Sequence, residues 1–369
     1  MVKAVRTVRL FLSGDVMTGR GLDQILPHPG DPRIYEPVIH DARDYVRLAE
    51  AANGPIPRPV DVAYPWGEAL DVLRRIAPNA RVVNLETAVT ARGAPWPKGI
   101  NYRMHPANIG TLTAAALDVC VLANNHTLDY GPEGLLETLA TLRAAGLRTA
   151  GAGRDLEEAR RPAVVPLPGG GRLLVFAFAA ASSGVPPQWA AAPGEPGVAF
   201  IPELTPQEAE RIAGHVRGLK RDGDLVLLSL HWGSNWGYEI AAEQVRFAHR
   251  LIDAGVDLVH GHSSHHPRSI EIYRGRLVLY GCGDLLDDYE GISGYEEFRH
   301  DLRLMYFPAL AGETGELTAL TIVPLRIRRM RLERASEEDA RWLAIRLTEI
   351  SRPFGVRVET TGEGLLRAA

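Results

Sequence analysis

Four histidines lie within seven positions of the stretch VHGHSSHHPRSIEIY, which spans residues 259–273. They are His260, His262, His265 and His266. The stretch ends an apolar run, which is typical of a buried strand that passes into a loop. Imidazoles in such a cluster bind a metal ion, handle protons or belong to a solvated loop. A metal site needs further ligands, which must come from elsewhere in the chain.

Ligand-type side chains also stand where several predicted buried strands end. The carboxyl ends of parallel strands meet at one edge of an α/β sheet, which is where such sheets bind their ligands. One such residue alone is usually a turn former or a helix cap. Five strand ends with oxygen or nitrogen ligands are a much less common coincidence and indicate one site. The residues concerned are Asp15, Glu86, Asn125, His126, His231 and His262.

The ligand set consists of carboxylates, imidazoles and one amide oxygen, with almost no thiolate. This set favours Zn, Mn or Fe at a hydrolytic centre, and Ca or Mg is also compatible with it. Two metal ions held about 3.5–4 Å apart and bridged by a carboxylate need roughly this number of groups. We therefore expect two divalent metal ions as cofactors.

The apolar pattern that must position these residues is that of an α/β protein. Short, continuously apolar runs alternate with stretches of helical spacing at residues 131–147, 205–220 and 241–255. A polar, Pro-rich piece at residues 27–66 interrupts the pattern and is interpreted as an insertion or lid. From about residue 268 hairpins replace the alternation. We therefore predict one domain over residues 1–330 with this insertion.

A C-terminal extension follows at residues 331–369, with a helix near residues 336–350, and we expect it to pack on the domain. The 369 residues carry a formal net charge of −4, and acidic and basic residues are interspersed. This pattern lacks the broad basic surface of a nucleic-acid-binding protein. No apolar run approaches the roughly 20 residues of a membrane span. We expect a cytoplasmic protein without a membrane span, and the pattern specifies no oligomeric state.

Several motifs together resemble the CapA family, the poly-gamma-glutamate capsule synthesis proteins, which look like a branch of the calcineurin-like metallophosphoesterases. The resemblance covers about residues 8–290, with the motifs in the family's order. It implies a four-layer fold, in which two mixed sheets are flanked by helices and a dinuclear metal centre lies at the strand ends. The motifs are GDVMTGR, NLETAVT, NNHTLDYGPEGLLETLATLRAAGL, GAGRDLEEARRP, HWG and GHSSHHPRSIEIYRGRLVLYGCGD.

The resemblance also implies roles for individual residues. Asn125 corresponds to the amide ligand of the metals, and Glu86 stands where the metallophosphoesterases have a bridging aspartate. His126 resembles the histidine that works as an acid or base beside the metals, with Asp129 placed to orient it. The full set of metal ligands implied is Asp15, Glu86, Asn125, His231, His262 and His265.

The two remaining histidines of the cluster receive supporting roles. If the strand runs straight through Gly261, His260 shares a face with His262 one pleat further from the rim. His260 is therefore interpreted as a buried residue behind the ligands. His266 is grouped with the catalytic residues, where it either faces the substrate or supports a ligand.

Two departures from the family pattern concern the pocket. Met17 stands where metallophosphoesterases have a second ligand, and a thioether is a poor ligand for a hard ion. Asp284 stands where many relatives have a neutral residue, which places it among the candidate substrate-binding residues. Arg20 is a candidate for bidentate binding of a substrate carboxylate or phosphate. Trp232 and the aromatic residues that follow it are candidates for the pocket wall.

Three kinds of function agree with these observations. The first is a dinuclear-metal hydrolase of a peptide or poly-gamma-glutamate-like amide, in which His126 protonates the leaving group. The second is a metal-dependent peptide epimerase in a ribosomal-peptide pathway, which removes and returns an α-proton. The third is a phosphoesterase or a non-catalytic capsule polymer-binding protein. Retention of every ligand type except that at Met17 argues against the non-catalytic function.

Overall fold

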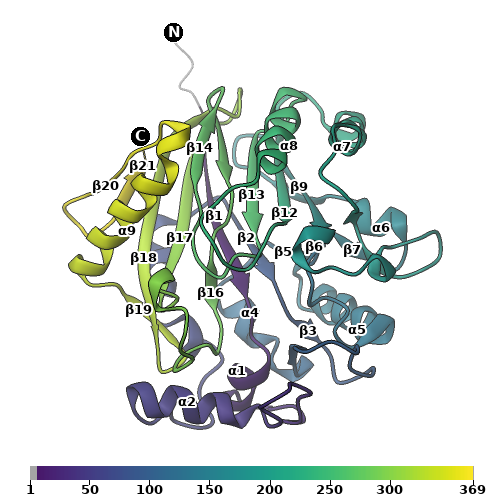
Figure 1. Cartoon of the computed structure of the whole chain (residues 1–369). Coiled ribbons are helices and arrows are strands. Elements are labelled where there is room, and N and C mark those ends of the chain that lie inside the picture. Colours follow the sequence, from purple (N-terminus) through teal and green to yellow (C-terminus); the bar gives the residue numbers. More distant parts are fainter. Residues whose placement is uncertain (1–5, 369) are drawn as a thin grey trace.

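The computed structural model describes residues 6–368, so residues 1–5 of the predicted N-terminal strand segment and Ala369 lie outside it. Two mixed β-sheets pack against each other, and helices cover their outer sides (Figure 1). Contacts between β1 and β13 and between β6 and β9 join the two sheets. The predicted α/β architecture of two mixed sheets flanked by helices is therefore confirmed.

The first sheet has ten strands and contains the N-terminal half of the candidate site. Its main order is β20-β21-β18-β17-β1-β2-β5-β6, with β16 beside β1 and β19 beside β18. The pairs β1–β2, β2–β5 and β5–β6 are parallel, so their carboxyl ends share one edge. The strands are β1 Thr7–Val16, β2 Ala80–Leu85, β5 Val119–Val121, β6 Arg148–Ala150, β16 Asp284–Leu286, β17 Leu302–Ala311, β18 Leu317–Arg328, β19 Arg331–Arg334, β20 Val358–Thr360 and β21 Leu366–Ala368.

The second sheet has seven strands in the main order β11-β9-β12-β13-β15-β14, with β8 beside β9. Strand β12 explains the continuous apolar pattern, because its two faces bury different residues. Leu225 and Leu227 join the larger core, whereas Leu228 and Leu230 pack toward α7 (Pro206–Leu219) and α8 (Ala242–Asp253). The strands are β8 Ala163–Pro166, β9 Arg172–Ala180, β11 Phe200–Ile201, β12 Leu225–His231, β13 Leu258–His262, β14 Ile270–Tyr273 and β15 Arg276–Leu279.

The remaining elements cover the sheets or connect them. Two short pairs lie outside the main sheets, β3 with β4 and β7 with β10. Helices α3, α4, α5 and α9 contribute apolar side chains to the larger core. The bounds are α1 Arg20–Ile25, α2 Arg43–Asn53, α3 Ala69–Ile76, α4 Gly110–Ala114, α5 Gly131–Ala144, α6 Leu156–Arg160, α9 Glu337–Ser351, β3 Ala88–Val89, β4 Arg103–Met104, β7 Ala152–Gly153 and β10 Gly197–Val198.

The predicted insertion at residues 27–66 contains helix α2, which packs against α1 at the lower end of the molecule in Figure 1. Its apolar residues Tyr45, Val46 and Ile56 are buried. A lid function for this segment stays a prediction.

The C-terminal extension supplies β20 and β21, which continue the first sheet next to β18, and helix α9 packs beside them.

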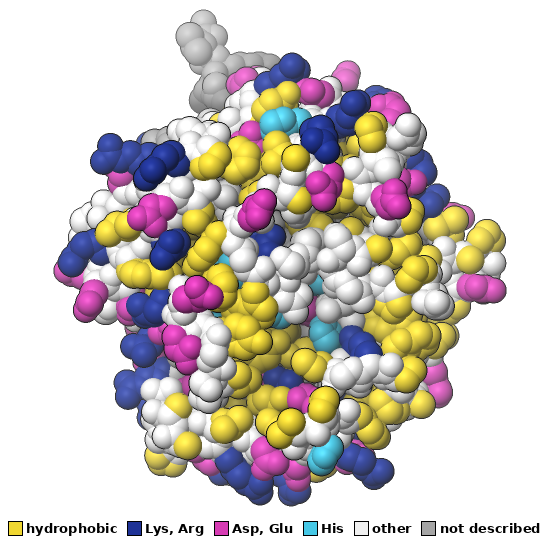
Figure 2. All heavy atoms as spheres, in the orientation of Figure 1, with side chains coloured by type: hydrophobic (Ala, Val, Ile, Leu, Met, Phe, Trp, Pro, Cys, Tyr) yellow, Lys and Arg dark blue, Asp and Glu magenta, His cyan; other side chains and the backbone are white. Residues whose placement is uncertain are grey.

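Within residues 6–368 no helix combines the length and the apolar character that crossing a bilayer requires. The cytoplasmic location stays a prediction. On the face shown in Figure 2, acidic and basic side chains are interspersed.

A local irregularity in β1 sets the position of Asp15. The register with β2 shifts between Ser13 and Asp15, and Asp15 then pairs with Asn84 on β2 and with Asp284 on β16. Such bulges re-aim a side chain at the end of a strand. A Cβ on Gly14 would lie 1.7 Å from the carbonyl oxygen of Gly283, so only glycine allows this close approach. The sequence of β1 thereby brings two carboxylates next to each other.

Candidate metal centre

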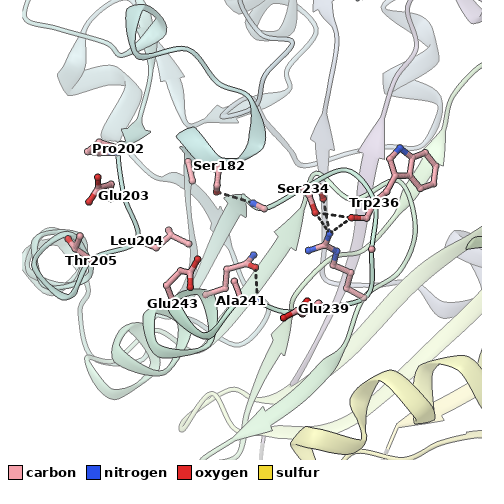
Figure 3. Close-up of a pocket in the computed structure, with 15 residues that line it drawn as sticks. Ser182, Pro202, Glu203, Leu204, Thr205, Ser234, Trp236, Glu239, Ala241 and Glu243 are labelled. Carbon is pink, nitrogen blue, oxygen red and sulfur yellow. Dashed lines mark hydrogen bonds between the residues drawn. The ribbon is translucent and has the colours of Figure 1, made fainter.

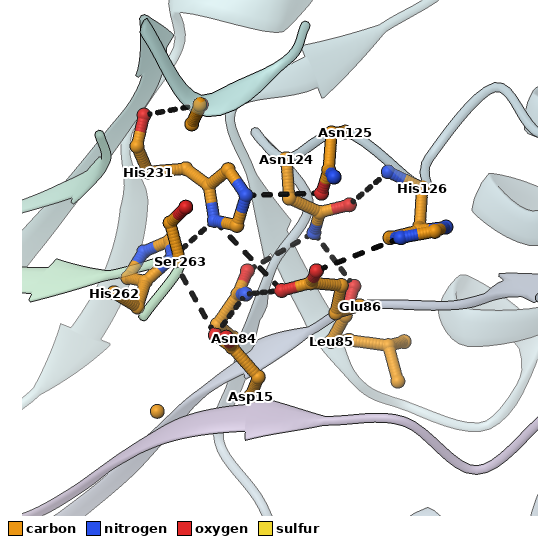
Figure 4. A network of polar contacts seen from close by, with 12 residues as sticks. Asp15, Asn84, Leu85, Glu86, Asn124, Asn125, His126, His231, His262 and Ser263 are labelled. Atoms are coloured by element: carbon orange, nitrogen blue, oxygen red, sulfur yellow. Dashed lines mark hydrogen bonds and ion pairs between the residues drawn. The ribbon is translucent and has the colours of Figure 1, made fainter. Parts of the chain in front are cut away.

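The predicted strand ends meet at one place between the two sheets. Asp15 is the second-last residue of β1, and Glu86 follows β2 in the first sheet. His231 ends β12 and His262 ends β13, and these two residues are register partners in the second sheet. Figure 4 shows side chains from both sheets pointing toward one another. The sequence-based prediction that these residues share one site agrees with this arrangement.

One candidate ligand group consists of Asp15, His231 and His262, all buried, with one ligand atom from each residue within 4.8 Å of the others. The Nδ1 atoms of His231 and His262 face each other at 2.8 Å. Two imidazole nitrogens at this distance need a proton on one of them or a cation between them. Burial lowers the pKa of both histidines well below its usual value, so both are neutral and able to bind a metal.

A second candidate ligand group consists of Asp15, His265 and Asp284, again with ligand atoms within 4.8 Å of one another. His265 Nδ1 lies 2.9 Å from Asp284 Oδ1. Pairing of β16 with β1 brings the Asp284 carboxylate beside Asp15, so the structure offers Asp284 as a candidate ligand, and its predicted role in substrate binding stays a prediction. The two groups share Asp15, which is the arrangement expected of a carboxylate between two metal ions.

Two observations test whether this donor set fits divalent cations. Asp15 Oδ2 and Asp284 Oδ2 are buried and have no hydrogen-bond partner among the described residues. Burial and the neighbouring Asp284 carboxylate raise the pKa of Asp15 to about 7. Burial, Asp15 and Asp284 likewise raise the pKa of Glu86 well above its usual value. Crowded, buried carboxylates with free oxygens are stabilised by a cation, so the donor set fits the metals.

Glu86 lies beside the first group without belonging to either group. Its Oε2 lies 3.8 Å from His231 Nδ1, and its Oε1 lies 3.8 Å from His126 Nε2. Glu86 is therefore next to a candidate ligand and to the candidate acid or base. Its predicted role as the bridging ligand stays a prediction, and the structure offers Asp15 as the carboxylate common to both groups.

An amide clamp that the sequence analysis missed holds the two carboxylates. Asn84 Nδ2 donates to Asp15 Oδ1 at 2.8 Å and to Glu86 Oε2 at 2.9 Å. Asn124 Nδ2 in turn donates to Asn84 Oδ1 at 3.0 Å. A signal was available, because Asn84 is a polar residue inside the apolar strand VVNLE. Asn125, the predicted amide ligand, places its Oδ1 3.0 Å from His231 Nε2.

His126 has the position predicted for an acid or base. Its Nδ1 lies 2.6 Å from Asp129 Oδ2, which leaves Nε2 facing Glu86. Lys98 forms an ion pair of 2.5 Å with the other oxygen of Asp129 and lies 3.3 Å from His126 Nδ1. Burial lowers the pKa of His126 to about 4 despite the attraction of Asp129. His126 is therefore neutral at pH 7 and can accept a proton at Nε2. The sequence analysis missed Lys98.

His260 has the supporting position that the sequence predicted. Its Nδ1 lies 3.1 Å from Ser229 Oγ, which also lies 2.8 Å from His262 Nε2. Its Nε2 lies 2.8 Å from the backbone oxygen of Ser13. His260 and Ser229 thus fix the ring of His262, and such outer contacts orient metal ligands.

Arg20 lines the small cavity beside His265, but its charge is paired within the chain. The residue is 3% exposed, and its guanidinium donates to both carboxylate oxygens of Asp288, while Nη1 donates to Glu36 at 2.7 Å. The ring of Tyr45 also lies 3.5 Å from its Cζ. Two carboxylates of this chain already neutralise the charge, and the role of Arg20 in binding a substrate anion stays a prediction.

Trp232 departs from the prediction. Its side chain is 1% exposed, stacks on Tyr280 and donates from Nε1 to the Tyr280 carbonyl at 3.0 Å. Trp232 continues the alternation of β12 on the face opposite His231, so it belongs to the core. Trp236 instead lines a cavity of about 230 Å³ next to His265. His266 packs between aromatic rings, with Trp236 on one side and Phe298 4.5 Å from it.

The comparisons with known proteins agree on one family. The profile of the bacterial capsule synthesis protein PGA_cap matches residues 9–289. The probable polyglutamine synthesis accessory protein of Mycobacterium tuberculosis is 54% identical over 361 residues, which cover 97% of this chain and 95% of that protein. The PGA biosynthesis protein CapA of Bacillus subtilis is 25% identical over 84% of this chain and 70% of that protein.

Among solved structures, that of TT1561 of Thermus thermophilus superimposes with a TM-score of 0.38 at 10% sequence identity, covering 85% of this chain and 97% of the other. The profile match extends over most of the chain, and the relative from Mycobacterium tuberculosis matches nearly end to end. The chain therefore belongs to the PGA_cap family of bacterial capsule synthesis proteins, which includes CapA.

Proposed function

We propose that this protein is a hydrolase that uses two divalent metal ions to cleave an amide bond in a peptide or polyglutamate-like substrate. The observation that carries the proposal is the sharing of Asp15 by two buried ligand groups. The names of the relatives connect the family with polyglutamine synthesis and with PGA biosynthesis, which supports a glutamate-containing substrate.

In this proposal Asp15, His231 and His262 hold one metal ion, and Asp15, His265 and Asp284 hold the other. Bound divalent ions would supply Lewis-acid polarisation of the carbonyl and an activated water. His126 is neutral and presents Nε2 beside Glu86, so it would take a proton there and pass it to the departing amine. Asp129 would accept a hydrogen bond from Nδ1–H and so keep His126 in this tautomer, and Lys98 holds Asp129 in turn.

The charge of the centre supports an amide rather than a phosphoester substrate. Asp15, Glu86 and Asp284 surround the candidate metal positions, and Arg20 is neutralised within the chain. A substrate phosphate would therefore lack a free arginine and meet additional carboxylates. A neutral amide carbonyl is not repelled in this way.

The proposal is tested with the metal-loaded protein and a short γ-glutamyl oligomer in ¹⁸O-labelled water. Hydrolysis predicts shorter products that carry one labelled oxygen in the new carboxylate. His231→Ala, which removes one candidate ligand, should abolish the reaction, and Glu271→Gln, remote from the centre, should retain it. Intact oligomer after prolonged incubation with each candidate metal would refute the proposal for this substrate class.

A parallel incubation in heavy water separates the epimerase alternative. An epimerase exchanges an α-proton for deuterium and leaves the chain length unchanged, whereas a hydrolase shortens the chain. Deuterium in an intact peptide would show that the same residues catalyse proton transfer, and the epimerase function would then replace the hydrolase function.

A further inference from the structure

A larger cavity of about 780 Å³ is lined in part by Gly233, Ser234 and Trp236 of the loop that follows β12 (Figure 3). Trp236 lines both this cavity and the small one beside His265, so both spaces border the loop that follows β12. None of the candidate metal ligands lines the larger cavity. Its polar groups therefore have no assigned role in the function proposed above.

Arg268 provides a buried cation in the wall of this cavity. Its side chain is 2% exposed and forms no ion pair with a carboxylate of residues 6–368. Nη2 donates to the Ser234 carbonyl at 2.8 Å and to Ser234 Oγ at 2.9 Å, but Nε has no partner in the described chain. Burial lowers the pKa of Arg268 only to about 10, so the group stays charged at neutral pH. A buried charge without a counter-ion is costly unless a ligand supplies one.

Gln244 provides a second unused donor in the same wall. It is 4% exposed and lies in the first turn of α8, where its Oε1 accepts from the Ala241 amide at 3.3 Å. Its Nε2 has no hydrogen-bond partner within residues 6–368. A buried amide donor left without a partner is destabilising, and a ligand acceptor would satisfy it.

These two donors face the same space. A Cβ built on Gly233 would lie 3.0 Å from Gln244 Nε2 and 3.3 Å from Arg268 Nη1. Gly233 has a φ of +80°, and its missing side chain leaves the space between the donors open. A guanidinium and an amide N–H that converge on one space are suited to a carboxylate.

The rim of the cavity has the opposite charge. Glu203, Glu239 and Glu243 line it and are exposed to solvent. A ligand whose carboxylate binds Arg268 and Gln244 would therefore bind more tightly if it also carried an ammonium group near these glutamates. The α-carbon at the free amino end of a γ-linked glutamyl chain carries both groups.

We infer that this cavity is a subsite for the amino-acid end of a glutamyl chain, with Arg268 and Gln244 binding its α-carboxylate. The identity of the chain rests on the function proposed above, but the binding of a carboxylate by these two residues does not. The acidic rim would bind the α-ammonium group of the same residue. The subsite would thus hold one end of the substrate while the adjoining metal centre acts on the chain.

The test is calorimetric binding of the dipeptide γ-L-glutamyl-L-glutamate to protein freed of metals by a chelator. The variant Gln244→Glu keeps the oxygen that accepts from Ala241 but replaces the unused donor by a carboxylate. We expect it to weaken binding about tenfold or more, since hydrogen bonds to charged groups contribute about 1.5–3 kcal/mol. Arg268 itself is a poorer choice, because its loss would release Ser234 and the following loop.

The matched control is Gln207→Glu, the same change at an exposed position in the first turn of α7. Its affinity for the dipeptide should stay within about twofold of that of the wild type, because solvent and salt screen an exposed charge. The melting temperature of Gln244→Glu should not fall, since the new carboxylate gives Arg268 a counter-ion. Converting the α-carboxylate of the first residue of the dipeptide to an amide should also weaken binding about tenfold.

Equal affinities of wild type and Gln244→Glu, or no binding to the wild type at millimolar concentration, would overturn the subsite. Hydrolytic assays with metal-loaded protein report separately on the proposed function. If Gln244→Glu weakens binding but the wild type does not hydrolyse the oligomer, the subsite stands and the hydrolase is refuted. If the wild type hydrolyses the oligomer but Gln244→Glu binds the dipeptide as tightly as the wild type, the hydrolase stands and the subsite is refuted.

Discussion

Replacing Asp284 by Asn separates a metal ligand from a substrate-binding residue. The amide has nearly the same size, and its oxygen can still accept from His265 Nδ1, which lies 2.9 Å from Asp284 Oδ1. The variant therefore keeps the ring orientation of His265 but loses one of the carboxylates of the second ligand group. Metal affinity should change while the fold is retained.

The expected loss of metal affinity follows from the position of the Asp284 carboxylate in the second ligand group. Loss of contacts that only orient a metal ligand costs about 10–100-fold in affinity, so loss of a direct carboxylate ligand should cost at least about 100-fold. In the metal-free protein Asp284 raises the pKa of Asp15 and Glu86, but its pair with His265 outweighs burial and lowers the pKa of Asp284 itself. The substitution therefore relieves repulsion and also breaks an ion pair, so metal affinity is the deciding measurement.

The assay combines metal titration by calorimetry with thermal unfolding in the presence and absence of chelator. We expect two Mn²⁺ ions per wild-type chain and one tightly bound ion in Asp284→Asn. Glu271→Gln, a buried carboxylate remote from the centre, serves as the control and should bind both ions. Two ions with unchanged affinities in Asp284→Asn would show that Asp284 is not a ligand.

Three further predictions concern the same centre. His126→Gln should retain its metal content but lose about 10²–10⁴-fold in kcat, because a positioned acid or base contributes that much; loss of metal, measured by mass spectrometry, would make His126 a ligand instead. The folded-state pKa of Asp15 is raised to about 7, so its contribution to stability without metal falls as pH rises from 4 to 7. Metal-free Asp15→Asn should therefore gain stability over the wild type across this pH range in chemical unfolding, and a constant difference would contradict the shift. Aryl phosphates should be hydrolysed well below the ~1 s⁻¹ of a slow dedicated enzyme, and fast release of the phenol would favour the phosphoesterase function.

Much of the fold and of the centre could be predicted from local sequence patterns. Continuous apolar runs predicted the buried strands, because both faces of a strand such as β12 pack against other layers. Ligand-type residues at the strand ends predicted that Asp15, His231 and His262 would meet. This reasoning succeeds because parallel strands of buried sheets end at a common edge.

Local patterns say least where contacts between distant segments decide the surroundings of a side chain. Asp284 became a candidate ligand only through pairing of β16 with β1. Arg20 is neutralised by Asp288 and Glu36, which no local pattern connects to it. Trp232 could have been assigned correctly, since its alternation with His231 on β12 places it on the other face.

The most direct test of the two-metal centre is anomalous diffraction from crystals of the protein soaked with Mn²⁺, collected near the metal absorption edge. We expect two peaks about 3.5–4 Å apart, one beside His231 and His262 and the other beside His265 and Asp284, with Asp15 next to both. Peaks elsewhere on the chain, or a single peak that contacts none of these histidines, would contradict the two-metal centre.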